Sequence, residues 1–145
     1  MPHDPARVAE TREWLQKASV DLRAARIDLE ANPPLVEDTL FHCQQAVEKA
    51  LKSFLAWHDR PFRKTHSLEE LGAASETVDP TLKSVVDLAV PLTEFAWVFR
   101  YPGDHQVPTD EEARQALDVA QRAVADVVAR LPLEAIPPAL SHLTA

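Results

Sequence analysis

Apolar residues recur every three or four positions along most of the chain, and runs that alternate apolar and polar residues are nearly missing. This is the period of an amphipathic α-helix, in which residues three and four apart share one face. The pattern predicts long helices over residues 6–31, 36–57 and 109–131. The apolar faces of the first two are expected to comprise Val8, Thr11, Leu15, Ala18, Leu22, Ala25 and Leu29, then Leu40, Val47, Ala50, Leu51, Phe54 and Leu55.

Capping residues and prolines set the expected helix boundaries. Asn32-Pro33-Pro34 must end the first helix, because consecutive prolines cannot continue it. Ser67-Leu68-Glu69-Glu70 fits a capping box that opens a short helix ending near Ser75, and Thr109-Asp110-Glu111-Glu112 fits a second box. Asp79-Pro80 places an N-cap before a proline at the first helical position.

Pro91 interrupts the helix that follows Asp79. Either the helix kinks there, or Pro91 opens a second helical piece that continues to Arg100. The apolar run Val85–Val90 could form a strand, but no partner strand is predicted elsewhere, so we expect it to be helical.

The composition supports one all-α domain. There are 2 glycines among 145 residues, and short connections between long amphipathic helices predict an up-and-down bundle of four to five helices over residues 1–131. Residues 132–145 hold three prolines and are expected to form a loosely docked tail. No segment reaches the roughly 20 apolar residues of a membrane span, and the N-terminus is too polar for a signal peptide, so we expect a cytoplasmic protein without a membrane partner.

The charge is acidic overall but unevenly distributed. The net charge of −8 argues against broad electrostatic binding to nucleic acid. Between residues 49 and 66, however, five cations face one acid, which gives a local charge of +4. These cations are Lys49, Lys52, Arg60, Arg63 and Lys64. A small basic patch of this kind favours a local phosphate site, for which Lys49, Lys52, Arg63 and Lys64 are candidates.

The stretch FAWVFRYPGDH, residues 95–105, carries the most distinctive chemistry. The Tyr-Pro-Gly turn after Arg100 stops the helix and presents His105 on its other side. A guanidinium is always charged and matches phosphate oxygens bidentately, while an imidazole can move protons near neutral pH. Tyr101 is a weaker candidate for stacking on a base, and Asp104 could orient His105.

Structural roles compete with these assignments. Arg100 could instead bind free carbonyls at a helix end or pair with Glu48 or Asp104, and His105 could be an ordinary exposed loop residue. His42 and His58 are not spaced as metal ligands. We expect Cys43, the single cysteine, to be a small buried apolar residue. We therefore expect neither a metal nor a cofactor.

Two segments together resemble the HEPN domain family. The first is FHCQQAVEKALKSFLAWHDRPFRKTHSLEEL, residues 41–71, and the second is the Arg100-Tyr101-Pro102 corner with His105. The second segment matches the family's signature of an arginine and a histidine separated by four to six residues. The resemblance covers roughly residues 10–130.

The resemblance implies a helical bundle that often forms a homodimer with two Arg/His corners near each other. It also implies a metal-independent ribonuclease, commonly a toxin encoded beside a minimal nucleotidyltransferase antitoxin. Arg100 and His105 would then be catalytic, with Glu48 and Lys49 in support. Some toxin members carry a tyrosine two residues after the histidine that accepts nucleotidyl groups; this chain has Val107 there.

Three functions thus remain open on the sequence. The first is a ribonuclease-type toxin acting on RNA. The second is a non-catalytic module that binds a nucleotide or dimerises and so regulates a nucleotidyltransferase, which Val107 and the acidic net charge favour. The third is a helical adaptor without a ligand.

Overall fold

A computed structural model describes residues 2–103 and 105–144 of the chain. Its α-helices are α1 (Pro5–Glu30), α2 (Val36–Trp57), α3 (Leu68–Val78), α4 (Lys83–Ala89) and α5 (Asp110–Val128). Short 3₁₀ segments connect or follow them, and the described residues form no strand. The expected all-α bundle is therefore confirmed, and the Val85–Val90 run is helical rather than extended.

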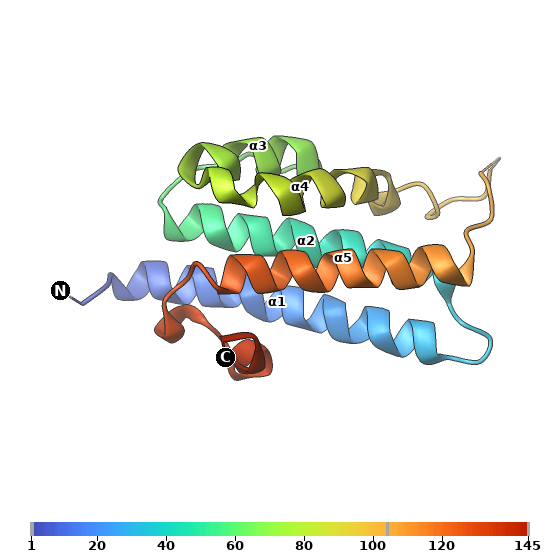
Figure 1. Ribbon diagram of the computed structural model, residues 1–145, viewed down its shortest axis with the longest axis horizontal. Helices are drawn as coiled ribbons and strands as arrows, with labels where there is room; N and C mark the ends of the chain where they lie inside the picture. The colour runs from blue at the N-terminus through green and yellow to red at the C-terminus, as the bar shows by residue number, and fades with distance from the viewer. Residues whose placement is uncertain (1, 104, 145) are drawn as a thin grey trace.

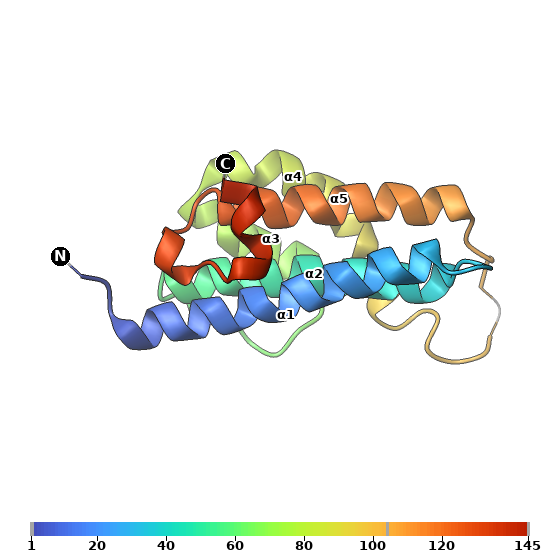
Figure 2. The same ribbon diagram turned by 90° about the horizontal axis from the view of Figure 1, so that it is seen from below.

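The helices form a bundle in which α2 is central (Figure 1). α1 and α2 make an antiparallel hairpin, α5 packs against both, and α3 and α4 cover the remaining side of α2. The turn that joins α1 to α2 and the segment before α5 lie at the same end of the bundle in both views (Figures 1 and 2). We call this the hairpin end.

The three expected N-caps form. The Ser67 hydroxyl accepts the Glu70 amide at 3.1 Å, and the Thr109 hydroxyl accepts the Glu112 amide at 3.1 Å. The Asp79 carboxylate accepts the amide of Thr81 at 3.0 Å. Each bond satisfies an amide that has no partner within its own helix, which explains why the helices begin where the sequence predicts.

The helix around Pro91 differs from the expectation. α4 ends at Ala89, Val90–Ala96 form a 3₁₀ segment, and Trp97 to Arg100 are turns, so no α-helix continues to Arg100. Pro91 has no amide hydrogen to donate to the carbonyl one turn before it, and its ring crowds that carbonyl. Pro91 instead lies in the first turn of the 3₁₀ segment, where an amide hydrogen would have no partner within that segment.

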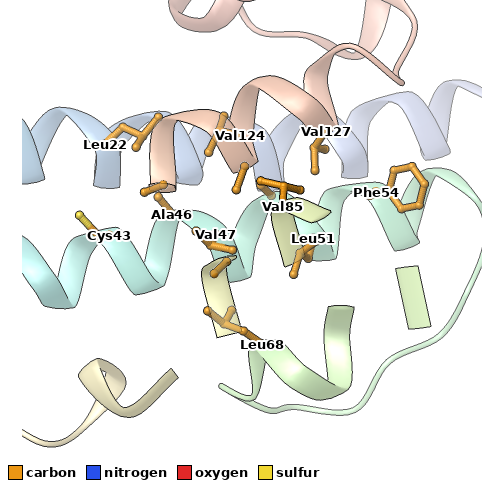
Figure 3. Packing of buried hydrophobic residues seen from close by; sticks show 14 of the residues in the cluster. Leu22, Cys43, Ala46, Val47, Leu51, Phe54, Leu68, Val85, Val124 and Val127 are labelled. Atoms are coloured by element: carbon orange, nitrogen blue, oxygen red, sulfur yellow. The ribbon is translucent and has the colours of Figure 1, made fainter. Parts of the chain in front are cut away.

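The core runs along α2 and is made almost entirely of aliphatic side chains (Figure 3). Val47 and Leu51 of α2 lie close to Val85 of α4, while Val124 and Val127 approach from α5. The small residues Ala46, Ala50, Ala120 and Ala123 are fully or almost fully buried, which permits close approach of the helices.

The segment after α5 packs against the bundle through a few apolar side chains. Ala135, Ile136 and Leu140 are buried, and the 3₁₀ segment Pro138–Thr144 contacts α1 and α5. In the part of the chain that the structure describes, no helix combines the length and the apolar character that a membrane crossing requires.

Candidate functional site

A hollow of about 640 Å³ opens at the hairpin end. One wall comes from the α1–α2 turn and the start of α2, and the other from the segment after α4. Its lining residues are Pro34, Leu35, Val36, Glu37, Asp38, Phe41, Phe95, Phe99 and Arg100. The hollow therefore combines aromatic walls with one cation and two acids.

Arg100 is placed on this hollow by the aromatic residues before it. The rings of Phe95 and Phe99 stack with centroids 5.6 Å apart, and both are half-buried against the core. The Arg100 amide donates to the carbonyl of Trp97 at 3.1 Å, which closes a turn and leaves the guanidinium exposed. Arg100 is thus anchored through its backbone while its charged group can reach a ligand.

His105 approaches the same residues from the other side of the turn. Its ring packs edge-on against Phe99, with centroids 5.0 Å apart, and its Nε2 lies 3.4 Å from Oε1 of Glu37. Phe99 and Glu37 both line the hollow, so the structure gathers Arg100 and His105 around it. The sequence did not point to Glu37, because that residue lies near the start of α2, far from the turn along the chain.

The polar residues expected to support Arg100 lie elsewhere on α2. Glu48 is buried, accepts Gln44 Nε2 at 3.1 Å, pairs with Lys52 Nζ at 3.0 Å and lies 2.8 Å from His66 Nδ1. We call Gln44, Glu48, Lys52 and His66 the central cluster. Its members are each other's partners, and Glu48 is not paired with Arg100.

The other candidate phosphate ligands do not line the hollow of Arg100. Lys52 and Lys64 line a second hollow of about 660 Å³, where Lys52 lies over the rings of Trp14 and Phe62. Nε of Arg63 donates to both carboxylate oxygens of Glu70, at 2.8 and 3.0 Å. Tyr101 is 72 % exposed beside Arg100, and Asp104 lies outside the described residues.

A second polar group lies between α1 and α2 near the hairpin end. His42 Nδ1 is 2.8 Å from Oδ1 of Asp21, and Lys49 Nζ donates to Oδ2 of Asp21 at 2.6 Å. Asp28 and Asp38 complete what we call the end cluster: Asp21, Asp28, Asp38, His42 and Lys49. Lys49, expected to bind phosphate, is therefore paired with an aspartate in this structure.

Asp28 has the most unusual environment in the end cluster. It is 9 % exposed, and its Oδ2 has no hydrogen-bond partner among the described residues. Burial, reinforced by the neighbouring Asp38 carboxyl, raises the pKa of Asp28 to about 6. This group could not be recognised in the sequence, because its members come from two helices. The one local signal is the four-residue spacing of Asp38 and His42.

Comparison with protein families identifies the fold. The HEPN domain family matches residues 11–131, so the chain belongs to the HEPN domain family. Membership fits a ribonuclease-type or nucleotide-related module, and HEPN domains commonly form dimers. Searches of the curated proteins and of the solved structures found no match.

Proposed function

We propose that this protein is a metal-independent ribonuclease of the toxin type, in which Arg100 and His105 act on an RNA phosphate. The observation that carries the proposal is the convergence of Arg100, His105 and Glu37 on one aromatic-lined hollow. Phe41, Phe95 and Phe99 offer surfaces on which bases can stack, and base stacking on aromatic rings tolerates any sequence.

The proposed chemistry needs proton transfer and charge stabilisation. The 2′-hydroxyl attacks the adjacent phosphate, a base removes its proton, and an acid protonates the departing 5′-oxygen, leaving a 2′,3′-cyclic phosphate and a 5′-hydroxyl. The Glu37 carboxylate lies 3.4 Å from Nε2 of His105 and favours a proton on that nitrogen, so Nδ1 is the nitrogen left to take the proton. Arg100 stabilises the charge that develops on the phosphate oxygens.

A homodimer would supply the second histidine. Trp97 and Tyr101, which flank Arg100, are 52 % and 72 % exposed, and such large apolar surfaces beside a charged site favour a protein contact. In a dimer built through this region, one His105 serves as base and the partner copy serves as acid. A nucleotidyltransferase antitoxin would act by covering this surface, because Val107 has no hydroxyl to accept a nucleotidyl group.

The test is expression of wild type, Arg100→Ala and His105→Ala from a tightly repressed promoter, followed by growth and RNA integrity. Arg122→Ala and His142→Ala are matched controls, because both residues are exposed and lie away from the hollow. We expect growth arrest and RNA cleavage in wild type and both controls, and loss in the two site variants. Cleavage by the purified protein should persist in EDTA. Intact RNA in every strain contradicts the proposal.

A non-catalytic nucleotide-binding module is the second candidate. It is favoured by the composition of the hollow, where Arg100 is the one lysine or arginine among the lining residues and Glu37 and Asp38 would repel a long polyanion. Titration with ATP separates the two functions. Binding that is lost in Arg100→Ala but kept in His105→Ala, together with normal growth on expression, supports this second function.

A further inference from the structure

We propose that Asp28, Asp38 and His42 bind a divalent transition-metal ion at the hairpin end. One carboxylate oxygen from each aspartate and one ring nitrogen of His42 lie within 4.8 Å of one another. Asp28 comes from the last turns of α1, and Asp38 and His42 lie one turn apart on the facing side of α2. An ion at this position would bridge the two helices where their connecting turn begins.

The separations suit a common ion. Metal–ligand bonds of about 2.0–2.2 Å place two ligand atoms of one ion roughly 3–4.4 Å apart. Nε2 of His42 is 3.4 Å from Oδ2 of Asp38, which lies inside that range. The wider limit of 4.8 Å for the whole set requires only a small inward movement of a carboxylate.

Asp21 orients the ring of His42 for metal binding. Its Oδ1 lies 2.8 Å from Nδ1 of His42, and its Oδ2 accepts the Lys49 ammonium. A carboxylate that accepts the proton of one ring nitrogen leaves the lone pair of the other nitrogen available and fixes the ring orientation. Nε2, the nitrogen that faces Asp38, is therefore the one that can coordinate an ion.

Asp28 provides a second and independent observation. It is 9 % exposed, and its Oδ2 makes no hydrogen bond within the described part of the chain. A buried carboxylate oxygen without a donor is costly, and bound metal ions are one of the few groups that satisfy it. Lys49 balances Asp21, whereas Asp28 and Asp38 have no lysine or arginine within ion-pair distance among the described residues. A doubly charged cation would balance these two acids.

The chemical type of the ligand atoms indicates which ion would bind. Two carboxylate oxygens with one imidazole nitrogen suit Zn²⁺ or Mn²⁺, while Mg²⁺ prefers oxygen ligands alone and loses its water reluctantly. Three protein ligands leave positions for water. Asp38 is half-exposed and lines the hollow of Arg100, so an ion can reach the site from solvent. No metal was expected from the sequence, because these ligands come from two different helices.

The test is metal binding by the untagged, EDTA-stripped protein, measured by calorimetry with Zn²⁺, Mn²⁺ and Mg²⁺ in the absence of RNA. We expect one equivalent of Zn²⁺ or Mn²⁺ to bind, and Mg²⁺ to bind far more weakly. Asp28→Asn and His42→Gln should each weaken binding about 100-fold or more because each removes a direct ligand. Asp21→Asn should weaken it about 10- to 100-fold through the orientation of His42.

Matched controls are Asp87→Asn and His142→Gln, which change an exposed aspartate and an exposed histidine outside the end cluster. They should bind like wild type. Absence of stoichiometric binding, or binding unchanged by both Asp28→Asn and His42→Gln, overturns the proposal. Circular dichroism establishes that each variant is folded. The assay uses no RNA, so its result is independent of whether Arg100 and His105 cleave RNA.

Discussion

The central and end clusters are two polar groups on the same helix, and they differ in how completely their atoms are paired. In the central cluster, Glu48 has partners on both oxygens, and Gln44 donates both to Glu48 and to the carbonyl of His66. In the end cluster, Asp21 is likewise saturated, but Asp28 keeps a buried oxygen without a donor. A saturated network stabilises the fold, whereas an unsaturated one has capacity left for a ligand.

If the two clusters differ in this way, substitution of Glu48 should cause the largest loss of stability. Replacing it by glutamine leaves Lys52 buried without its carboxylate and weakens the contact to His66. Removing one partner of a buried ion pair typically lowers the free energy of unfolding by about 3–5 kcal/mol. Urea unfolding of Glu48→Gln, with the exposed Glu69→Gln as control, measures this loss. A loss below about 1 kcal/mol would contradict a structural role for the central cluster.

The helices of this bundle were predictable from the sequence, but the segment after α4 was not. The recurrence of apolar residues every three or four positions located the helices, because residues at that spacing share a helix face. Capping residues located their starts, because Ser67 and Thr109 bind amides that are otherwise unpaired. The 3₁₀ segment after Ala89 was not predicted, since both alternatives considered for Pro91 kept an α-helix up to Arg100.

Only part of the candidate site could be predicted from the sequence. Arg100 and His105 are separated by one short turn, so they lie close together almost regardless of how the helices pack. Glu37 joins them only because the hairpin and the segment after α4 end at the same side of the bundle. The band of Glu48, Lys49 and Lys52 looked like a ligand site because polar residues interrupted an apolar face. Glu48 and Lys52 pair with each other one turn apart on α2. The partner of Lys49 comes from α1, and His66, the further partner of Glu48, comes from the loop before α3, so neither could be predicted from this helix alone.

Asp28 should give a smaller effect of the opposite sign. In EDTA, Asp28→Asn removes a buried carboxyl group that lacks a donor on one oxygen, so little favourable interaction is lost. We expect the free energy of unfolding to stay unchanged or to rise by about 1 kcal/mol. The measurement is urea unfolding of Asp28→Asn and Glu48→Gln side by side in EDTA. Equal losses of unfolding free energy in the two variants would show that both clusters stabilise the fold. The distinction between a saturated and an unsaturated cluster would then be wrong.

The smallest effect is expected at Cys43, which lies on α2 between His42 and Gln44 and thus between the two clusters. Its side chain is fully buried, and burial raises the pKa of its thiol to about 12 from the ordinary value of 9.0. At pH 8 the folded protein then holds about one thiolate in 10⁴ molecules, against roughly one in ten for an unfolded chain. A thiol reagent should therefore label native protein far more slowly than protein in urea, and raising the pH from 7 to 9 should not produce rapid labelling.

The rate of Cys43 labelling in variants of the two clusters also tests which cluster keeps α2 closed. Glu48→Gln should accelerate modification of Cys43, because local opening of α2 becomes easier when the central cluster is broken. Asp28→Asn should leave the rate close to that of wild type, because the removed carboxyl oxygen made no hydrogen bond to a described residue. Rapid labelling of the wild-type protein at pH 8 would show that this part of α2 opens readily. The saturated network would then not be what holds it closed.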